Sequence, residues 1–367
     1  SNINGSGNDY LAVTAITSAM LSTLRHAQSA DTIIFVHEDL APLKIVRGAT
    51  DASWTVSTIT FENVPRHAYT LTTSNPAANI TPDSTSDNVK ITASAAVWHE
   101  GRTGTAQAGG SSTITLDSGA SATDDIYIGA TITTTGGTGS GQTRIISDYV
   151  GSSKVATVSA AWSTTPASDT TFEVSSQVGQ YINALETFGR LRIIEFVSST
   201  VVKAYAETAL FDTDAIASGD WELESGYEDA WSSDRGYPKS LTFHEGRLYF
   251  AGTKSLPTTF FGSVVNSFFD FDKGEGLDDQ SIEATIVTES LNAIVDIFSG
   301  RDLQIFTTGG EFYVPQTTNE PITPGNLVVK TATRNGAKVG VPVVGLDSGT
   351  LFIQRSGKQL NEMLFTD

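Results

Sequence analysis

Five segments of this chain repeat one form, in which a short apolar strand, a tight polar turn and a second strand follow one another. The turns include Gly309-Gly310 and Ser356-Gly357, set between runs rich in Val, Ile, Phe and Tyr, which is the pattern of β-hairpins. The hairpins recur at irregular intervals, and radially repeated hairpins are one way to build a β-propeller. We therefore predict an all-β, multi-hairpin core that is β-propeller-like, with a sandwich or several small β modules as alternatives. The five segments span residues 32–46, 189–207, 236–263, 300–314 and 349–365.

The composition agrees with strands and turns. The chain has 367 residues, enough for two or three domains or for one large all-β unit with an insertion. Its hydrophobic content of 39% allows a sizeable core, whereas only 17% of its residues are charged. Gly, Ser and Thr make up the difference, and such a chain favours strands over long surface helices.

The charge balance excludes several classes of function. The net charge is −19, and tight binding of nucleic acid or of an anionic membrane surface needs an excess of Lys and Arg. The absence of cysteine excludes a disulfide scaffold, a thiolate zinc site and a Cys nucleophile. We find no apolar run of about 18 residues, so no membrane-spanning helix is expected.

One short helix is expected near the amino end. Thr17 or Ser18 can cap it, and the apolar residues Ala19, Met20, Leu21, Leu24 and Ala27 follow at helical spacing. Residues 1–10 lack the basic and apolar regions of a signal peptide, which suggests a flexible lead or an artificial end. The last eight residues stop just after a strand-like alternation, so we expect a piece of a longer chain.

The middle of the chain differs from the rest in amino-acid composition. Residues 96–176 are rich in Gly, Ser, Thr and Ala, with short β-branched runs between Gly-rich turns. We interpret STITL, DIYIGATITTT, GQTRIISDYV, KVATVSAAW and TTFEV as strands of one inserted antiparallel module. The predicted domains are this module and a discontinuous β core made of residues 1–95 and 177–367.

Three His-Glu pairs occur in the chain, and such a pair could supply a general base with its carboxylate. His244-Glu245 precedes Gly246-Arg247, a combination that we interpret as a hairpin turn, with Arg247 anchoring a nearby carboxylate or carbonyl. His37-Glu38-Asp39 has the same form, and we interpret it as the polar end of a strand. His99-Glu100 lies at the mouth of the predicted module. The histidines, at 26, 37, 67, 99 and 244, show no i, i+4 pair of the kind that binds zinc on a helix.

Two further stretches resemble ligand loops. Gly136–Thr143 is rich in glycine, yet it lacks the Gly-Lys-Ser/Thr ending of a phosphate loop, so a hairpin loop is favoured. The stretch DFDKGEGLDD could hold calcium, but Ser281 stands where the closing Glu of an EF-hand loop would be. A solvated acidic loop is favoured there. Its carboxylates are Asp270, Asp272, Glu275, Asp278 and Asp279.

The segment 207–234 holds nine acidic residues, no Lys or Arg, and the aromatics Trp221, Tyr227 and Trp231. A glycosidase cleft needs two opposed carboxyls, which a sequence cannot place. An acidic surface or pore lining is the default, with Asp220, Glu222, Glu224 and Asp278 as examples. No Gly-x-Ser-x-Gly elbow is present. The sequence therefore assigns no catalytic, cofactor-binding or metal-binding residue, and no cofactor.

Several stretches, taken in order, resemble one family, the tail tubular protein B or tail nozzle family of short-tailed bacteriophages and their prophage relatives. The resemblance covers most of the chain outside the middle module, although parts expected before and after this chain are missing. It is carried by 21–47 (with AQSADTIIFVH), 53–65, 221–272 (with GYPKSLTFHEGRLYFAG), 292–315 (SGRDLQIFTTGGEFYVP) and 322–363 (beginning ITPGN).

The resemblance implies a structural protein of the virion tail, made in the bacterial host cytoplasm, and not an enzyme. Members form a ring, usually a hexamer, and the expected partners are the adaptor and a tail fibre or needle. DNA would pass through transiently and without specificity, and no stable membrane association is expected. An acidic lumen suits this role because it repels phosphates. The alternatives are a module that binds host-surface carbohydrate or protein and, third, a β-propeller glycoside hydrolase.

Overall fold

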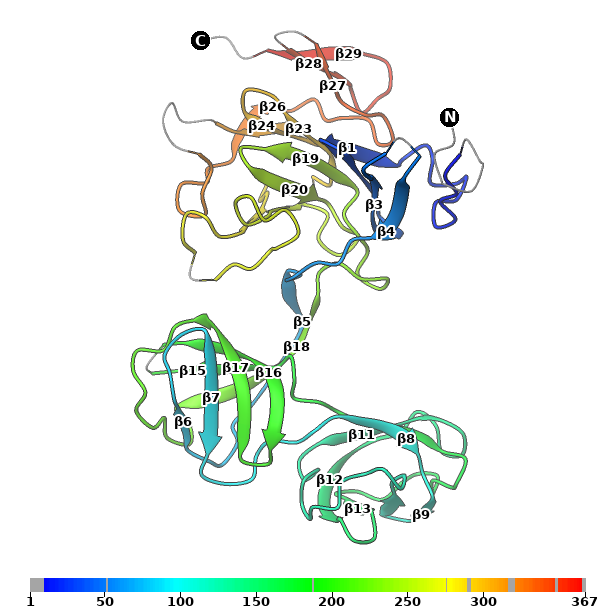
Figure 1. Cartoon of the computed structure of the whole chain (residues 1–367), viewed down its shortest axis with the longest axis vertical. Helices are drawn as coiled ribbons and strands as arrows, with labels where there is room; N and C mark the ends of the chain where they lie inside the picture. The colour runs from blue at the N-terminus through cyan, green and yellow to red at the C-terminus, as the bar shows by residue number, and fades with distance from the viewer. Residues whose placement is uncertain are drawn as a thin grey trace. The chain divides into compact units, whose positions relative to one another are not determined.

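The computed structural model describes residues 10–364 except 51, 187, 275, 289–291, 316–320 and 347–348. All regular elements in these ranges are β-strands, so the all-β prediction is confirmed. The strands form six sheets, and none of the sheets, as described, closes on itself (Figure 1). The chain forms two compact units, Ser1–His67 with Glu228–Asp367 (unit 1) and Ala68–Tyr227 (unit 2). No helix in the described ranges is long and apolar enough to cross a membrane.

The prediction of a short helix after Thr17 or Ser18 is wrong. Residues 18–23 form turns instead, and Ala27 already belongs to a strand. The backbone N–H of Leu24 donates to the carbonyl of Met20 at 2.8 Å, but that of Thr23 bonds to the same carbonyl at 3.0 Å in a tighter turn. Leu21 is 63% exposed. A helix this short needs a buried apolar face for its stability, and no side chain of residues 18–23 is fully buried.

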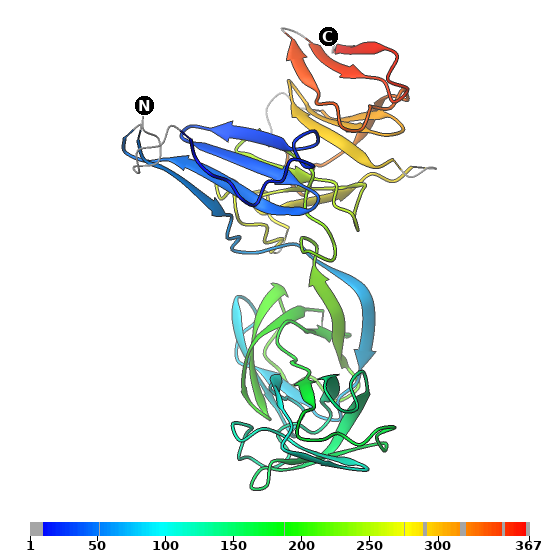
Figure 2. The ribbon, with the colours of Figure 1, turned by 90° about the vertical axis from the view of Figure 1, so that its right-hand side faces the viewer.

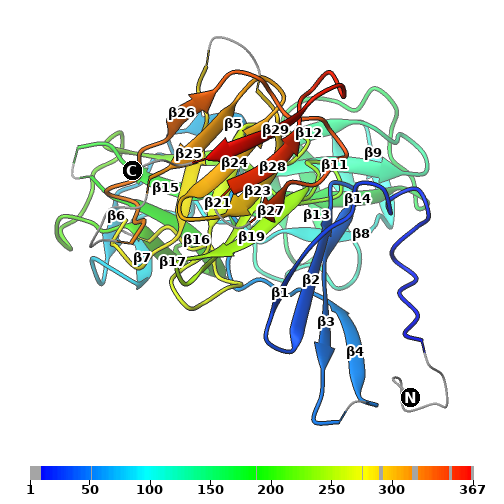
Figure 3. The same cartoon turned by 90° about the horizontal axis from the view of Figure 1, so that it is seen from above.

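Unit 1 consists of consecutive meanders in which each strand pairs with the next one along the chain. Three sheets have four strands and the last has three; Figure 3 shows the strand order across the third sheet. The first sheet contains β1 (Arg25–Ser29), β2 (Thr32–His37), β3 (Leu40–Arg47) and β4 (Trp54–Thr58). The second contains β19 (Ser240–His244), β20 (Arg247–Ala251), β21 (Thr259–Gly262) and β22 (Ile282–Thr285). The third contains β23 (Ile294–Ser299), β24 (Leu303–Thr307), β25 (Glu311–Val314) and β26 (Lys330–Thr333). The fourth contains β27 (Val344–Leu346), β28 (Gly349–Ile353) and β29 (Leu360–Leu364).

The first strands of the first three sheets are neighbours, since β1 packs against β19 and β19 packs against β23. Four-stranded meanders whose first strands face one another are the arrangement of β-propeller blades. The consecutive meanders agree with the predicted multi-hairpin core, and its likeness to a β-propeller stays a prediction.

The second sheet shows how the sequence produces this packing. All five residues of β20 are buried, and successive side chains of a strand point to opposite faces. Leu248 and Phe250 join one apolar cluster with residues of the first sheet, whereas Tyr249 and Ala251 join another with residues of the third. The sheet is thus covered on both faces, which explains its continuous apolar run.

Unit 2 contains two seven-stranded sheets. One has the order β5, β18, β15, β16, β17, β7, β6, and the other the order β8, β14, β11, β12, β13, β10, β9. The first comprises β5 (Arg66–Ser74), β6 (Ile80–Pro82), β7 (Asn88–Ala93), β15 (Tyr181–Ala184), β16 (Arg190–Ser198), β17 (Val201–Thr208) and β18 (Trp221–Asp229). The second comprises β8 (Arg102–Thr105), β9 (Ala108–Gly110), β10 (Thr113–Thr115), β11 (Thr131–Gly136), β12 (Thr143–Val150), β13 (Val155–Val158) and β14 (Thr171–Val174).

The chain passes between the units on two paired strands, β5 and β18 (Figure 2). On the unit 1 side, the N–H of Ala230 donates to the carbonyl of Pro65 at 2.7 Å, and Arg66 lies 3.5 Å from Asp229. The compact units change at 67/68 and 227/228, whereas the domain division into 1–95 with 177–367 and 96–176 stays a prediction.

Candidate functional site

The His244-Glu245 pair lies at the tip of the hairpin that joins β19 to β20, as predicted. Glu245 and Gly246 have φ angles of 45° and 76°, the left-handed conformation that tight hairpin turns need. The Nδ1 of His244 lies 2.9 Å from the hydroxyl of Ser299, and Glu245 accepts a hydrogen bond from the N–H of Ile322 at 2.9 Å. The two side chains thus serve different partners and form no base–carboxylate pair. Burial lowers the pKa of His244, which favours the neutral ring.

Arg247 follows this turn and is 1% exposed. Its guanidinium donates to the carbonyls of Ser263, Asp278 and Gln280, each at 2.6 Å. These are carbonyl partners, one of the two kinds that the sequence predicted. Arg247 therefore ties the acidic loop to the second sheet through the backbone of the loop.

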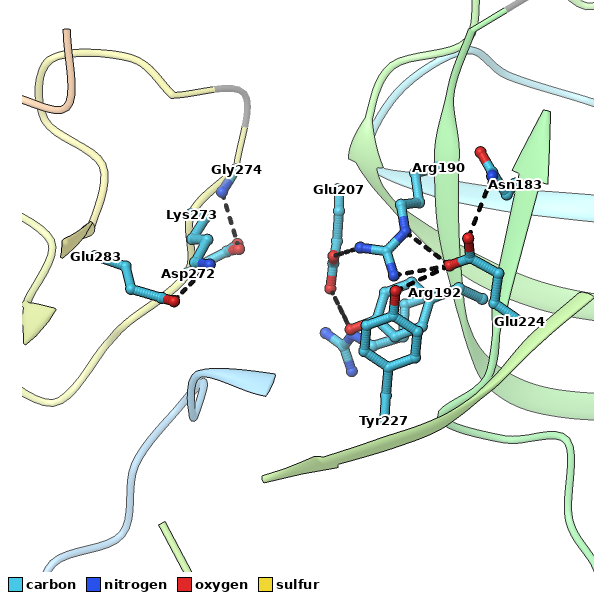
Figure 4. Close-up of polar contacts among 11 residues, drawn as sticks. Asn183, Arg190, Arg192, Glu207, Glu224, Tyr227, Asp272, Lys273, Gly274 and Glu283 are labelled. Atoms are coloured by element: carbon cyan, nitrogen blue, oxygen red, sulfur yellow. Dashed lines mark hydrogen bonds and ion pairs between the residues drawn. The ribbon is translucent and has the colours of Figure 1, made fainter. Parts of the chain in front are cut away.

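The acidic loop, residues 270–279, directs carboxylates onto its own backbone. Asp270 accepts hydrogen bonds from the side chain of Asn63 and from the N–H of Asp272, both at 3.0 Å. Asp272 in turn accepts from the N–H of Gly274 at 3.1 Å, as Figure 4 shows. Glu275 lies outside the described residues. In the part of the chain that is described, no group of three or more His, Asp or Glu side chains is placed to hold a metal ion.

Two other polar stretches singled out in the sequence end or join strands, and His37 does end β2. In the turn between β2 and β3, the Nδ1 of His37 accepts from the N–H of Asp39 at 3.1 Å, and its Nε2 lies 2.9 Å from the hydroxyl of Thr23. Of the stretch 136–143, Gly136 ends β11, Thr143 begins β12, and residues 137–142 form the loop between them, with positive φ at Gly137, Gly139 and Gly141, so the hairpin interpretation is confirmed.

His99 lies between β7 and β8 and is 7% exposed. Burial lowers its pKa to about 4, so the ring is neutral at neutral pH. Its backbone N–H donates to the side chain of Gln177 at 2.9 Å, while the adjacent Glu100 is exposed. No base–carboxylate pair forms here.

The tryptophans of the 207–234 segment belong to the cores. Trp221 is fully buried, and its ring N–H donates to the carbonyl of Ala78 at 2.9 Å. Trp231 packs edge-on against Phe61, Phe250 and Phe271. Neither ring is available as a platform for a sugar.

The acidic residues of this segment meet basic residues from another strand. Arg190 on β16 lies between two carboxylates, 3.0 Å from Glu224 on β18 and 3.7 Å from Glu207 on β17 (Figure 4). Arg192 approaches Glu207 at 3.2 Å. Glu224, expected on a surface, is only 8% exposed. We call this set, with Tyr181, Asn183 and Tyr227, the Arg190 network.

Two tyrosines complete the network. The guanidinium carbon of Arg190 lies 3.9 Å from the ring centre of Tyr181 and 4.5 Å from that of Tyr227. The hydroxyl of Tyr181 lies 2.9 Å from Glu207, and that of Tyr227 lies 3.1 Å from Glu224. Burial, together with Glu224, raises the pKa of Tyr227, so its hydroxyl stays protonated and donates. Both carboxylates are already ion-paired and hydrogen-bonded, an arrangement that stabilises the sheet face but leaves no free acid and base.

The network was missed from the sequence because Arg190 and Arg192 lie outside the acidic segment. Only the strand order brings them together, since β15 pairs with both β16 and β18. The alternation RLRI in β16 was the available signal, because it places two Arg side chains on the face opposite Leu191 and Ile193.

A second polar centre lies where the sheets of unit 1 meet. Asp296 on β23 is 6% exposed and accepts hydrogen bonds from the hydroxyl of Ser240 at 2.5 Å and from the N–H of Val343 at 3.0 Å. The Nε of Arg25 lies 3.6 Å from the same carboxylate. Burial raises the pKa of Asp296. Arg25, Ser240 and Asp296 belong to β1, β19 and β23, and Val343 directly precedes β27, so this Asp296 hub joins all four sheets of unit 1.

Comparison with known proteins identifies no family. No family model matches the chain, and no curated protein matches it. A solved structure, the Phage phi92 endosialidase, aligns at 12% identity and a TM-score of 0.21, over 90% of this chain and 61% of that one. The chain thus spans less than two thirds of the length of that structure. A likeness at this level defines neither the fold nor the activity of this chain, and membership of the tail nozzle family stays a prediction.

Proposed function

We propose that this chain is a non-catalytic structural component of a bacteriophage tail, of the nozzle or tail-tube type, that forms a conduit for DNA ejection. The observation that carries the proposal is where the family-like segments fall. Residues 221–272 include β19 to β21, residues 292–315 include β23 to β25, and residues 322–363 include β26 to β28. The segments that resemble the family therefore supply strands of the second, third and fourth sheets of unit 1, which the Asp296 hub joins.

The buried charges of this frame serve cohesion. Arg247 is used on backbone carbonyls, and Asp296 on groups from four sheets. Such cross-links suit a ring that must keep its shape while DNA passes. The net charge of −19 suits a lumen that repels phosphates.

The proposed assembly is a homo-oligomeric ring, hexameric by resemblance, with an adaptor on one side and a tail fibre or needle on the other. A cyclic ring closes its interfaces head to tail. The proposed location is the virion tail, after synthesis in the host cytoplasm. The role requires no cofactor and no stable membrane association.

Electron microscopy tests the proposal. An antibody raised against this chain is applied to whole virions, and the full-length protein is imaged alone and with its virion neighbours. Label at the tail tip together with ring-shaped class averages is the expected result. Unlabelled virions and a protein that stays monomeric with every neighbour would reject the tail-ring role.

A second candidate function is binding of a host-surface carbohydrate or protein, and one observation favours it. The sheet of β8, β14, β11 and β12 presents a face of hydroxyls, in which Thr133 lies 3.1 Å from Thr143 and Thr135 lies 2.9 Å from Thr171. Deleting about residues 98–174 should abolish adhesion to host cells without unfolding the rest. Adhesion that survives the deletion would exclude this sheet as the binder.

The third candidate, a glycoside hydrolase, needs two opposed carboxyls that are free to act. Glu207 and Glu224 lie on either side of one guanidinium, so this pair does not support the reaction. A sugar-release assay on host polysaccharides, with the double variant Glu207→Gln/Glu224→Gln as control, tests it. Release by the wild type that the double variant loses would revive this candidate.

A further inference from the structure

A cavity of about 100 Å³ lies in unit 1 beside the Asp296 hub. It is lined by residues in or next to the first and third sheets, by Lys239 directly before the second sheet, and by the segment before the fourth. Its polar lining includes Thr23, Arg25, His37, Glu38 and Lys239, and Ile294 is among its apolar residues. In a chain of net charge −19, a cavity that gathers Arg25 and Lys239 is unusual.

Lys239 contributes a positive charge without a partner. Its stem is held against Gly252, because a Cβ at that glycine would lie 2.8 Å from the Lys239 Cε. Among the described residues, no side-chain hydrogen bond or ion pair of Lys239 is formed. Burial lowers its pKa, as expected for an ammonium group that lacks a counter-charge in contact.

Arg25 contributes a second charge that is incompletely satisfied. Its side chain is 12% exposed, and one terminal nitrogen donates to the carbonyl of Leu24 at 3.3 Å. Its Nε is buried without a hydrogen-bond partner and only approaches Asp296, at 3.6 Å. A buried charged donor without a full partner is costly, so an acceptor in the cavity would be stabilising.

The charges around the cavity select the ligand. Arg25 and Lys239 bring two positive charges, and Glu38 brings one negative charge. His37 lines the cavity, with Nδ1 accepting from the Asp39 N–H and Nε2 lying 2.9 Å from the hydroxyl of Thr23. Asp296 lies behind Arg25 and is held by Ser240 and Val343. Burial raises the pKa of Asp296 and so favours its neutral form, in which the set carries one positive charge that a single negative charge balances. With Asp296 ionised, the set is already neutral.

We propose that the cavity binds a small monovalent carboxylate, with the oxygens between Arg25 and Lys239 and the alkyl part against Ile294. The carboxylate could belong to a free short-chain acid, or to an Asp or Glu side chain of a second copy of this chain. Both sources share the same chemistry, and the experiment below separates them. The site is independent of the proposed tail role.

The reactivity of Lys239 provides the test. The chain is acylated with a limiting amount of an N-hydroxysuccinimide ester, and peptide mass spectrometry measures the rate at Lys239 relative to Lys254, a surface lysine paired with Asp39. Acetate replaces chloride at constant ionic strength. A ligand of this size with a Kd of about 10 mM would, at about 100 mM, slow acylation of Lys239 by about tenfold. Lys254 should keep its rate.

Two variants sharpen the result. Arg25→Gln should remove the protection of Lys239, and Glu38→Gln should strengthen it by removing the repelling charge. Glu38→Gln tests the proposal even if Arg25→Gln fails to fold. The exposed Glu62→Gln is the matched control and should leave the protection unchanged.

The remaining outcomes decide the source and the fate of the proposal. Protection that grows with protein concentration, without added acetate, assigns the carboxylate to a second copy. Protection by acetate at every protein concentration assigns a free acid. The proposal would be overturned if Lys239 were acylated equally fast in chloride and in acetate and at every protein concentration. Stronger protection by phosphate than by acetate would also overturn it.

Discussion

The Asp296 hub and the Arg190 network both gather charged side chains from several strands, but they do so in opposite ways. The hub buries one carboxylate and satisfies it mainly with neutral donors from other sheets. The network places charges of both signs on one face of a single sheet and pairs them with each other. The hub therefore holds sheets together, whereas the network stabilises a sheet that its backbone already holds.

Removing the hub carboxylate should have the largest effect. Asp296→Ala leaves the hydroxyl of Ser240, the N–H of Val343 and the charge of Arg25 buried without their acceptor. We expect a loss of about 3–5 kcal/mol in the free energy of unfolding. Urea unfolding measures the loss, and hydrogen exchange over β1, β19 and β23 should show all three strands opening. A loss confined to β23 would contradict the role of the hub as a junction.

The pH dependence of the hub follows from its burial. The pKa of Asp296 is raised from 3.8 in the folded state, so folding retains a proton that the unfolded chain releases above that pH. Its stabilising contribution is complete below pH 3.8 and is lost as the pH rises toward the folded pKa. The cost of Asp296→Asn, which cannot ionise, should therefore be largest in acid and shrink as the pH rises. Unfolding of both proteins from pH 3.5 to 8 tests this, and a cost that grows with pH would contradict it.

Breaking the network should cost less. Arg190→Met unpairs two carboxylates and uncovers two tyrosines, but the Arg190 side chain is 29% exposed and water can replace part of the interaction. We expect a loss of about 1–2 kcal/mol in unfolding free energy. Arg192→Met, which affects Glu207 alone, is the matched control and should cost less. A cost for Arg190→Met that equals that of Asp296→Ala would remove the distinction between the two centres.

The smallest effect is expected on an exposed pair of the same sheet. Lys203 lies 2.8 Å from Glu195, and both side chains are about half exposed. Lys203→Met should change the unfolding free energy by no more than about 0.5 kcal/mol. Thermal unfolding at low and high salt measures it. A larger loss that disappears in high salt would show that exposed pairs also stabilise this face.

Local patterns predicted the hairpins but not the two charged centres. The turns at Glu245-Gly246 and Gly309-Gly310 were visible because their residues suit tight turns between apolar runs. The partners of Asp296 lie 56 and 47 residues away in the sequence, at Ser240 and Val343. Only the packing of sheets brings these residues together, so no local sequence pattern predicts that they are partners.

The strand that the sequence predicts to begin at Asp125 is not formed there. The run DIYIGA has the apolar alternation of a strand, yet Asp125 has a φ of 64° and residues 124–129 form turns. Tyr127 is buried against Tyr149 in the core of the module. Tyr127 reaches the core from a turn, so its burial requires no strand. The alternation of apolar residues alone cannot distinguish such a turn from a strand.

The two strands that carry the chain out of unit 1 and back have a consequence for inheritance. Pro65 and Ala230 are hydrogen-bonded neighbours, although 164 residues separate them. A gene segment that encodes everything between them can be lost, gained or exchanged by recombination, provided that the new segment also begins and ends side by side. Unit 1 can thus be conserved by descent while its insertion is replaced as a cassette.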